Sequence, residues 1–383
     1  MAVPLAWRNL TADKRRLAVS TLGIAFAVLL MLMQLGFRNA LVDSQVEILR
    51  WLKADIVLVS ASKYQLNVMQ PFPRRRLYQA AAVEGVASAR PIYLALEEAL
   101  WKSPDDRTTH RIRVVGVHPD DEIFNEKQLS DQQHKLWQPD TALVDTDCRR
   151  HIGRAFQGDS TEVTKRKIHV VGEFQLGTDF IIDGSAIVSD RTFLNLFPRY
   201  RAADPLLNRV ELGLLQISPG MTTSEVVERL NRELPKDVRA VTRAEFIGVE
   251  RNFWMNDSPV GLVFNLGTLV GFIVGIVICS QILFTDISEK MPQYATLKAI
   301  GYTNRYLRRV VIQQATFLAL VGFLPGVAAS WCGYRLIASL TGLLMRLQVG
   351  VAATVLFLTV GMCLVSGWFA VRTVLAADPA DVF

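Results

Sequence analysis

The sequence predicts an α-helical membrane protein with four transmembrane helices and one large α+β extracytoplasmic domain of two lobes. Four separate stretches of 21 or more residues contain no Asp, Glu, Lys or Arg. Each can cross a bilayer, because about 20 helical residues span a hydrocarbon core about 30 Å thick. Between the first and second stretches lie about 220 residues of soluble-protein composition. Basic residues gather in the short segments beside the stretches.

These stretches set the order of segments along the chain. The apolar run that begins at Leu17 is longer than the 7–15 residues of a signal peptide, and no A-x-A-like site follows it, so we expect an anchor. We expect transmembrane helices at 17–37, 258–285, 310–334 and 347–371, an extracytoplasmic domain at 38–257, and cytoplasmic segments at 1–16, 286–309 and 372–383.

The distribution of charge predicts which segments face the cytoplasm. Residues 38–257 carry 30 basic and 31 acidic residues, whereas the two ends and the 286–309 loop together carry 10 basic and 5 acidic residues. Basic residues in short loops mark the cytoplasmic side, while long domains cross regardless of charge. We therefore expect an integral protein of the inner (plasma) membrane with both termini cytoplasmic. The basic excess lies beside membrane spans, so we do not expect nucleic-acid binding.

The extracytoplasmic domain alternates strand-like and helix-like segments. Thr222 and Glu225 have the spacing of a capping box at the start of a helix. Two β-α pieces at 38–90 and 206–257 flank a strand-rich insert, so we expect a membrane-proximal lobe made of both flanks and an inserted lobe at 91–205. The expected strands are 54–61, 111–117, 167–174, 185–189, 209–217 and 238–241, and the expected helices are 74–83 and 222–234.

The residues that carry chemistry in enzymes and carriers are missing or poorly spaced. The chain has no P-loop and no G-x-S-x-G, and the spans contain none of the Asp, Glu, Lys, Arg or His residues that ion-coupled carriers use. All five histidines fall in the inserted lobe, and no two have the i,i+4 spacing of a helical metal site. Cys148 is the lone extracytoplasmic cysteine, so we expect no disulfide there. We predict no catalytic, cofactor-binding or metal-binding residue on this chain.

Two patterns point to helix contacts and to a partner. Small residues four apart allow helices to approach closely in lipid, and we leave open whether they pack within one subunit or form a dimer interface. In the 286–309 loop, Tyr294, Leu297 and Ile300 recur every three residues and Gly301 can end the helix. That short helix fits either the lipid surface or a docking partner. The repeated glycines are Gly267, Gly271, Gly275, Gly322 and Gly326.

The loop text QYATLKAIGYT (Gln293–Thr303) resembles the loop between the second and third spans of MacB/FtsX-type ABC transporter permeases. The segments PLAWRNLTADKRRL, GFLPG and DPADVF extend the resemblance along the chain, most closely to the DevC-like members of that family. The resemblance implies that the loop docks on a cytoplasmic ABC ATPase. The residues it assigns to this coupling are Glu289, Met291, Tyr294, Ala295, Leu297, Lys298, Ile300, Gly301 and Tyr302.

The resemblance also implies the function. It predicts the non-catalytic permease subunit of an ATP-driven tripartite exporter of a glycolipid or another amphiphile. Such permeases form homodimers in the lipid membrane, ATP–Mg binds their separate ATPase, and the outer domain contacts a periplasmic membrane-fusion adaptor that leads to an outer-membrane channel. Two alternatives share this layout: an FtsX-like regulator that activates a cell-wall hydrolase, and a permease that extracts lipoproteins.

Overall fold

The chain forms two compact units. The computed structural model describes residues 13–376 except 154, 180, 294, 295, 297–299, 342 and 344. The first, here called the helical unit, comprises Met1–Asn39, Pro259–Ile337 and Met345–Phe383. The second, here called the sheet unit, comprises Ala40–Ser258 and Ala338–Leu344.

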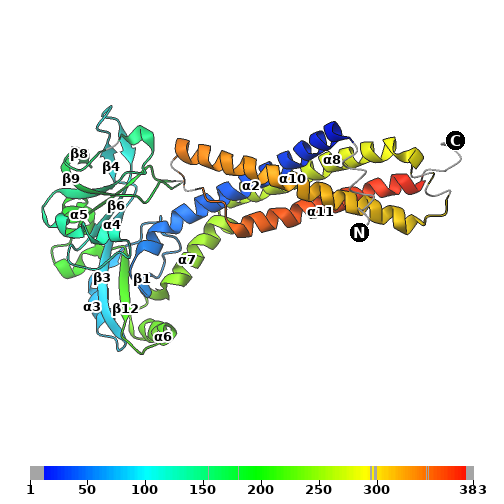
Figure 1. The fold of residues 1–383 in the computed structure, drawn as a ribbon. Helices are drawn as coiled ribbons and strands as arrows, with labels where there is room; N and C mark the ends of the chain where they lie inside the picture. Colours follow the sequence, from blue (N-terminus) through cyan, green and yellow to red (C-terminus); the bar gives the residue numbers. More distant parts are fainter. Residues whose placement is uncertain are drawn as a thin grey trace. The chain divides into compact units, whose positions relative to one another are not determined.

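The helical unit is built from four long helices that lie side by side (Figure 1). Each contains a stretch long and apolar enough to cross a membrane. The predicted four-helix membrane architecture with an α+β domain is therefore confirmed. The helices are α2 (Lys14–Trp51), α8 (Pro259–Glu289), α10 (Asn304–Thr341) and α11 (Val349–Ala376).

Helix α2 is much longer than the charge-free stretch from which it was predicted. It has 38 residues, so it is roughly 57 Å long. Its first turn is capped by Asp13, whose Oδ1 accepts the backbone N–H groups of Arg15 and Arg16 at 3.0 and 3.1 Å. Beyond Asn39 the helix belongs to the sheet unit, where Leu49 and neighbouring apolar residues are buried. Amphipathic burial continues the helix after the apolar span has ended.

The sheet unit is organised around one 11-stranded mixed sheet. Its strand order is β13-β1-β12-β3-β6-β10-β7-β9-β8-β4-β5, with parallel pairs β10–β6 and β7–β9 and antiparallel pairs elsewhere. The strands are β1 (Ile56–Ser60), β3 (Val86–Ala95), β4 (Leu100–Lys102), β5 (Thr109–Arg111), β6 (Arg113–Val117), β7 (Thr141–Asp145), β8 (Ser160–Val163), β9 (Arg166–Phe174), β10 (Ser185–Ser189), β12 (Leu212–Ile217) and β13 (Val238–Thr242), and β2 (Phe72–Pro73) pairs separately with β11 (Arg209–Val210).

Strand β3 joins the two halves of the sheet. Its residues 86–92 pair with β12, whereas its residues 93–95 pair with β6. Strands from the two flanks of the domain, β1, β12 and β13, lie on one side of it, and strands from 91–205 lie on the other. The flank and insert halves are thus parts of one continuous sheet, and the expected boundary near residue 90 falls inside β3.

Helices cover both faces of this sheet. Alternation along β3 sends Tyr93 and Ala95 into one core and Ile92 and Leu94 into the other. The first core also contains apolar side chains of α3, α5 and α6, and the second those of α4, α7 and the end of α2. These helices are α3 (Arg75–Ala81), α4 (Lys127–Ser130), α5 (Asp190–Leu196), α6 (Thr223–Glu233) and α7 (Arg243–Asn252), with short turns η1 (Gln133–Trp137), η2 (Arg150–Ile152), η3 (Pro198–Tyr200), η4 (Pro205–Leu207) and η5 (Phe253–Asp257).

Most expected elements of this unit are confirmed, but one capping prediction is wrong. Helix α6 begins after Thr222 as expected, and its stripe buries Val226 and Leu230. The Thr222 side chain nevertheless makes no cap hydrogen bond, so the predicted capping box with Glu225 does not form. Side-chain caps occur at other helices, where Thr242 Oγ1 accepts the Glu245 N–H at 3.0 Å and Ser189 Oγ accepts the Thr192 N–H at 3.2 Å.

A buried ion pair fixes the loop after β1. Lys63 Nζ lies 2.6 Å from Glu211 Oε1, and both side chains are fully buried. Lys63 also donates to the carbonyl oxygens of Leu66 and Val68 at 3.2 and 2.7 Å. Burial lowers the pKa of Lys63 and raises the pKa of Glu211, and the attraction between the two charges opposes both shifts.

Removing one partner of this pair should destabilise the sheet unit. We expect Glu211→Gln to cost about 3–5 kcal/mol, because the Lys63 ammonium would stay buried without its counter-ion. The double variant Lys63→Met/Glu211→Leu should recover part of that loss, since neither member of the pair is left alone, while the buried Glu250 loses the favourable charge of Lys63. Hydrogen exchange of buried sheet amides in the full-length protein measures both effects.

The control is the exposed pair between Lys53 and Glu122, whose side chains are 42% and 70% exposed. Lys53→Met should change stability by less than about 1 kcal/mol. A Glu211→Gln loss as small as that of Lys53→Met would show that the buried pair does not hold this loop.

Candidate functional site

The candidate site lies at one end of the helical unit, where α2 begins, α8 ends and α10 begins. Arg16 of α2 is paired with two carboxylates of α8: its Nη1 contacts Glu289 and its Nε lies 3.6 Å from Asp286 Oδ1. Lys290 Nζ reaches the same Asp286 oxygen at 2.8 Å. Asp286 is buried, with 10% of its side chain exposed, so two cations stabilise one nearly dry carboxylate. Charges at the ends of two spans are thereby joined across 273 residues of sequence.

A cavity of about 250 Å³ lies beside this charge network. Its polar lining comes from the network and from Ser20, and its apolar lining includes Leu17 and Leu318. Because the lining residues come from α2, α8 with the residues just after it, and α10, a shift of α8 against α2 would change the shape of this cavity.

The connection between α8 and α10 contains the predicted coupling residues. Ile300 and Tyr302 are 70% and 44% exposed, and the Tyr302 ring lies 4.7 Å from that of Tyr306. Gly301 has a φ of +103°, which L side chains rarely adopt, so a glycine ends the turn as expected. Met291 instead packs against the core of the helical unit.

The described coupling residues therefore divide by role. Met291 packs against the helical unit, whereas Glu289 pairs with Arg16 while 64% of its side chain stays exposed. Ile300 and Tyr302 are exposed and can meet a partner. The remaining predicted coupling residues, Tyr294, Ala295, Leu297 and Lys298, lie outside the described residues.

All of the repeated glycines of α8 and α10 lie against the same helix, α2. A Cβ added to Gly322 would lie 2.6 Å from Ile24, and one added to Gly326 would lie 2.7 Å from Val28. The α8 glycines contact other residues along α2. Their nearest α2 side chains are Gln34 for Gly267 at 2.8 Å, Met31 for Gly271 at 3.5 Å and Ala27 for Gly275 at 3.2 Å. The contacts in this chain thus correspond to packing within one subunit.

A side chain at Gly326 should push α10 away from α2. We expect Gly326→Ala to cost about 1–3 kcal/mol, because its Cβ would overlap Val28 in a close-packed interface. Trimming the partner in Val28→Ala/Gly326→Ala should restore little of the loss, because the Cβ of residue 28 and the Ala25 carbonyl oxygen would remain 2.7 and 2.9 Å from the new methyl group. The thermal unfolding midpoint of the full-length protein in detergent micelles measures the effect.

Gly361 of α11 provides a matched control, because a Cβ there meets no atom within 4 Å. Gly361→Ala should leave the midpoint unchanged or raise it, since alanine is the better helix former. If Gly326→Ala behaves like Gly361→Ala, the α2–α10 contact is not the close one described.

Comparisons with known proteins point to one class. Residues 265–379 match the family model described as FtsX-like permease C-terminal, which covers most of α8, the connection, α10 and α11. The chain is 23% identical over 393 residues to uncharacterized ABC transporter permeases from two strains of Mycobacterium tuberculosis, and the match covers 99% of this chain and 98% of theirs. These findings show homology to ABC transporter permeases and an FtsX-like permease domain.

Two solved structures are also similar to part of the chain. The extracellular domain of the noncanonic ABC-type transporter YknZ from Gram-positive bacteria aligns with a TM-score of 0.32 and 8% identity, covering 49% of this chain and 100% of that domain. A domain assigned to a permease protein from Porphyromonas gingivalis aligns with a TM-score of 0.32 and 13% identity, covering 49% of this chain and 86% of that one.

Proposed function

We propose that this homologue of ABC transporter permeases is the non-catalytic membrane subunit of an ATP-driven tripartite exporter of a glycolipid or another amphiphile. ATP–Mg would bind a separate ATPase chain. The observation that carries the proposal is the FtsX-like domain at 265–379, in which the connection after α8 presents Ile300 and Tyr302 to solvent. Exposed apolar side chains beside a charged network suit a docking surface for a soluble partner.

The charge pattern supports an orientation for this subunit. Basic residues at Lys14–Arg16 and at Arg305–Arg309 flank the ends of α2 and α10 near the connection. The positive-inside rule would put that end, and both termini, in the cytoplasm of a cell with this protein in its inner membrane. The sheet unit would then lie in the periplasm.

The ion network supports a route for transmitting motion. Two ATPases on a homodimer would shift the connection when they close on ATP. Arg16 ties α2 to α8 beside that connection, and α2 continues without a break to Trp51 in the sheet unit. A rigid helix can pass such a shift along its length. The sheet unit would transmit this shift to a membrane-fusion adaptor that leads to an outer-membrane channel.

Placing charges in the predicted coupling segment should release the ATPase. We expect Leu297→Asp/Ile300→Asp to reduce recovery of an ABC ATPase with the detergent-solubilised permease at least tenfold, because burying two carboxylates in the contact is unfavourable. Mass spectrometry and ATP hydrolysis by the purified complex measure the recovery. Leu206→Asp, which changes a 47% exposed leucine of the sheet unit, is the control and should leave recovery unchanged. Equal recovery from all variants would remove the docking assignment.

The proteins that co-purify with the permease should distinguish export from regulation of a cell-wall hydrolase and from lipoprotein extraction. We expect both an ATPase and a membrane-fusion adaptor to co-purify in mild detergent from native membranes. An ATPase that arrives with a cell-wall hydrolase and no adaptor would favour a regulator and contradict export. A bound lipoprotein in place of the adaptor would favour lipoprotein extraction.

A further inference from the structure

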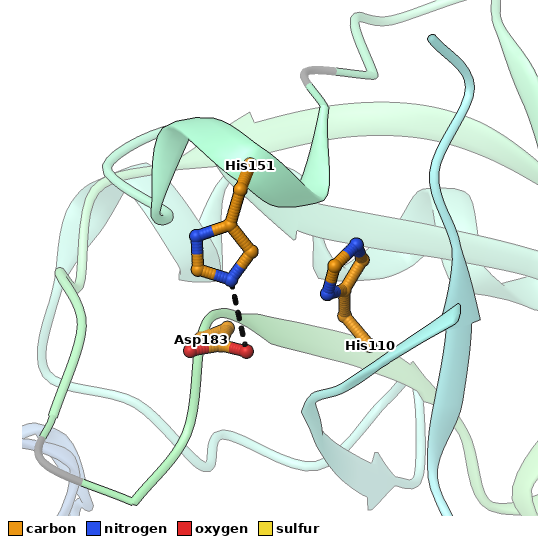
Figure 2. A group of neighbouring side chains, drawn as sticks. All are labelled: His110, His151 and Asp183. Atoms are coloured by element: carbon orange, nitrogen blue, oxygen red, sulfur yellow. Dashed lines mark ion pairs between the residues drawn. The ribbon is translucent and has the colours of Figure 1, made fainter. Parts of the chain in front are cut away.

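Three segments of the sheet unit bring two imidazoles and a carboxylate together. His110 lies on β5, His151 in η2, and Asp183 in the connection that leads to β10. One nitrogen or oxygen from each lies within 4.8 Å of the others. His151 Nε2 is 3.2 Å from Asp183 Oδ2. The ring centres of His110 and His151 are 4.9 Å apart. Figure 2 shows that each ring directs one nitrogen toward the space beside the Asp183 carboxylate.

Backbone hydrogen bonds hold these three segments together independently of the side chains. The Asp183 N–H donates to the Arg111 carbonyl at 3.3 Å, next to His110 in sequence. The Asp183 carbonyl accepts the Arg149 N–H at 2.9 Å, two residues before His151. These backbone hydrogen bonds therefore lie one residue away from His110 and two residues away from His151. Such a scaffold keeps both rings near the carboxylate.

A hydrogen-bond chain behind His110 fixes a proton on its outer nitrogen, Nε2. Thr108 donates its hydroxyl proton to Asp106 Oδ1 at 2.7 Å. The same Thr108 oxygen lies 2.6 Å from His110 Nε2, and it has no second proton to give. We therefore assign a proton to His110 Nε2, so that in the neutral ring Nδ1, the nitrogen that faces Asp183 in Figure 2, carries the lone pair that a metal ion would use. Metal-binding histidines almost always donate their other N–H group in this way.

We propose that His110, His151 and Asp183 bind a divalent transition-metal ion, with Zn²⁺ as the favoured occupant. Two imidazole nitrogens and one carboxylate oxygen are ligands that Zn²⁺ prefers, whereas Ca²⁺ and Mg²⁺ prefer oxygen alone. The 3.2 Å separation of His151 Nε2 and Asp183 Oδ2 matches the edge, about 3.3 Å, of a tetrahedron with zinc bonds of about 2.0 Å. The His110 nitrogen lies within 4.8 Å of the other two ligand atoms, so it would approach them by up to about 1.5 Å when an ion binds.

The surroundings of the cluster suit an accessible ion. Arg149 Nη1 pairs with Asp183 Oδ1 at 3.0 Å and leaves Oδ2 toward His151. The His151 side chain is 51% exposed, so solvent can supply the remaining ligands. The bound ion would cross-link β5, η2 and the connection before β10. No disulfide joins the residues that the structure describes, so metal binding would supply a cross-link that disulfides do not.

A simple surface ion pair between His151 and Asp183 is the competing explanation. It needs neither His110 nor the chain through Thr108 and Asp106. It also places two imidazoles close together, and protonation of both would make them repel each other. Metal binding uses both rings as neutral ligands, each through an inward nitrogen that carries no proton. The two explanations therefore differ in what the removal of His110 does.

The test is a Zn²⁺ titration of the full-length protein in detergent, after removal of any affinity tag and of bound metal, against a chromogenic chelator. We expect one ion per chain. We expect His110→Ala, His151→Ala and Asp183→Asn each to weaken binding by at least tenfold, and Thr108→Val to weaken it by about tenfold through the loss of the hydrogen bond that His110 Nε2 donates to Thr108. His134→Ala, which removes an exposed histidine of η1, should leave binding unchanged. Co²⁺ should give the visible absorption of a nitrogen-bound site that is lost in the ligand variants.

Less than about one-fifth of an ion per chain, or the same affinity in His110→Ala as in His134→Ala, would overturn the proposal and leave the surface ion pair. Circular dichroism and gel filtration check that each variant is folded. Asp183→Asn keeps the shape of the side chain, so unchanged Zn²⁺ affinity in that variant overturns the proposal even if a histidine variant misfolds. The readouts do not depend on an ATPase or a cargo, so failure of this site and failure of the export proposal are distinguishable.

Discussion

The close approach of α2 to its neighbours is the constraint on which the helical unit depends. Within lipid no hydrophobic force pulls apolar helices together, so tight van der Waals packing must hold them. The repeated glycines of α8 and α10 all provide that packing toward α2. Polar contacts tie α2 to α8 near both ends of the span, through Arg16 with Glu289 and through Arg38 Nη1 donating to Asn265 Oδ1 at 2.7 Å. Helix α2 is thus the common neighbour of α8 and α10, whereas α11 packs against α8, where Met362 lies against Gly275 and Ser366 donates to the Ile276 carbonyl.

The sequence predicted the elements of this fold well where a local pattern determines them. Charge-free length identified four spans, and β-branched runs identified β1, β9 and β10. The full length of α2 was missed, because the prediction ended at the first charge, Arg38. The helix continues since Asp43 pairs with Arg251 of α7 at 2.6 Å and Leu49 is buried in the sheet unit. Those partners are distant in sequence, and no local pattern shows them.

The candidate site was predictable only in part, for the same physical reason. The apolar spacing around Ile300 and the glycine at 301 locate the connection from sequence. The pairing of Arg16 with α8 is invisible there, although basic and acidic residues at the ends of the first two spans could have suggested it. The i,i+4 spacing of histidines detects only metal sites on one helix. His110 and His151 are instead brought together by a strand and a short turn of the sheet unit.

The sharing of β3 between the two halves of the sheet has a mechanical consequence. Antiparallel hydrogen bonds run perpendicular to the strands, so a pull along β3 would load its bonds to β12 and β6 in shear, all together. Bonds loaded in this way resist extension far better than bonds peeled apart one at a time. A force that moves the insert half would therefore move the flank half with it. The sheet unit would move as one rigid body rather than as two flexibly joined lobes.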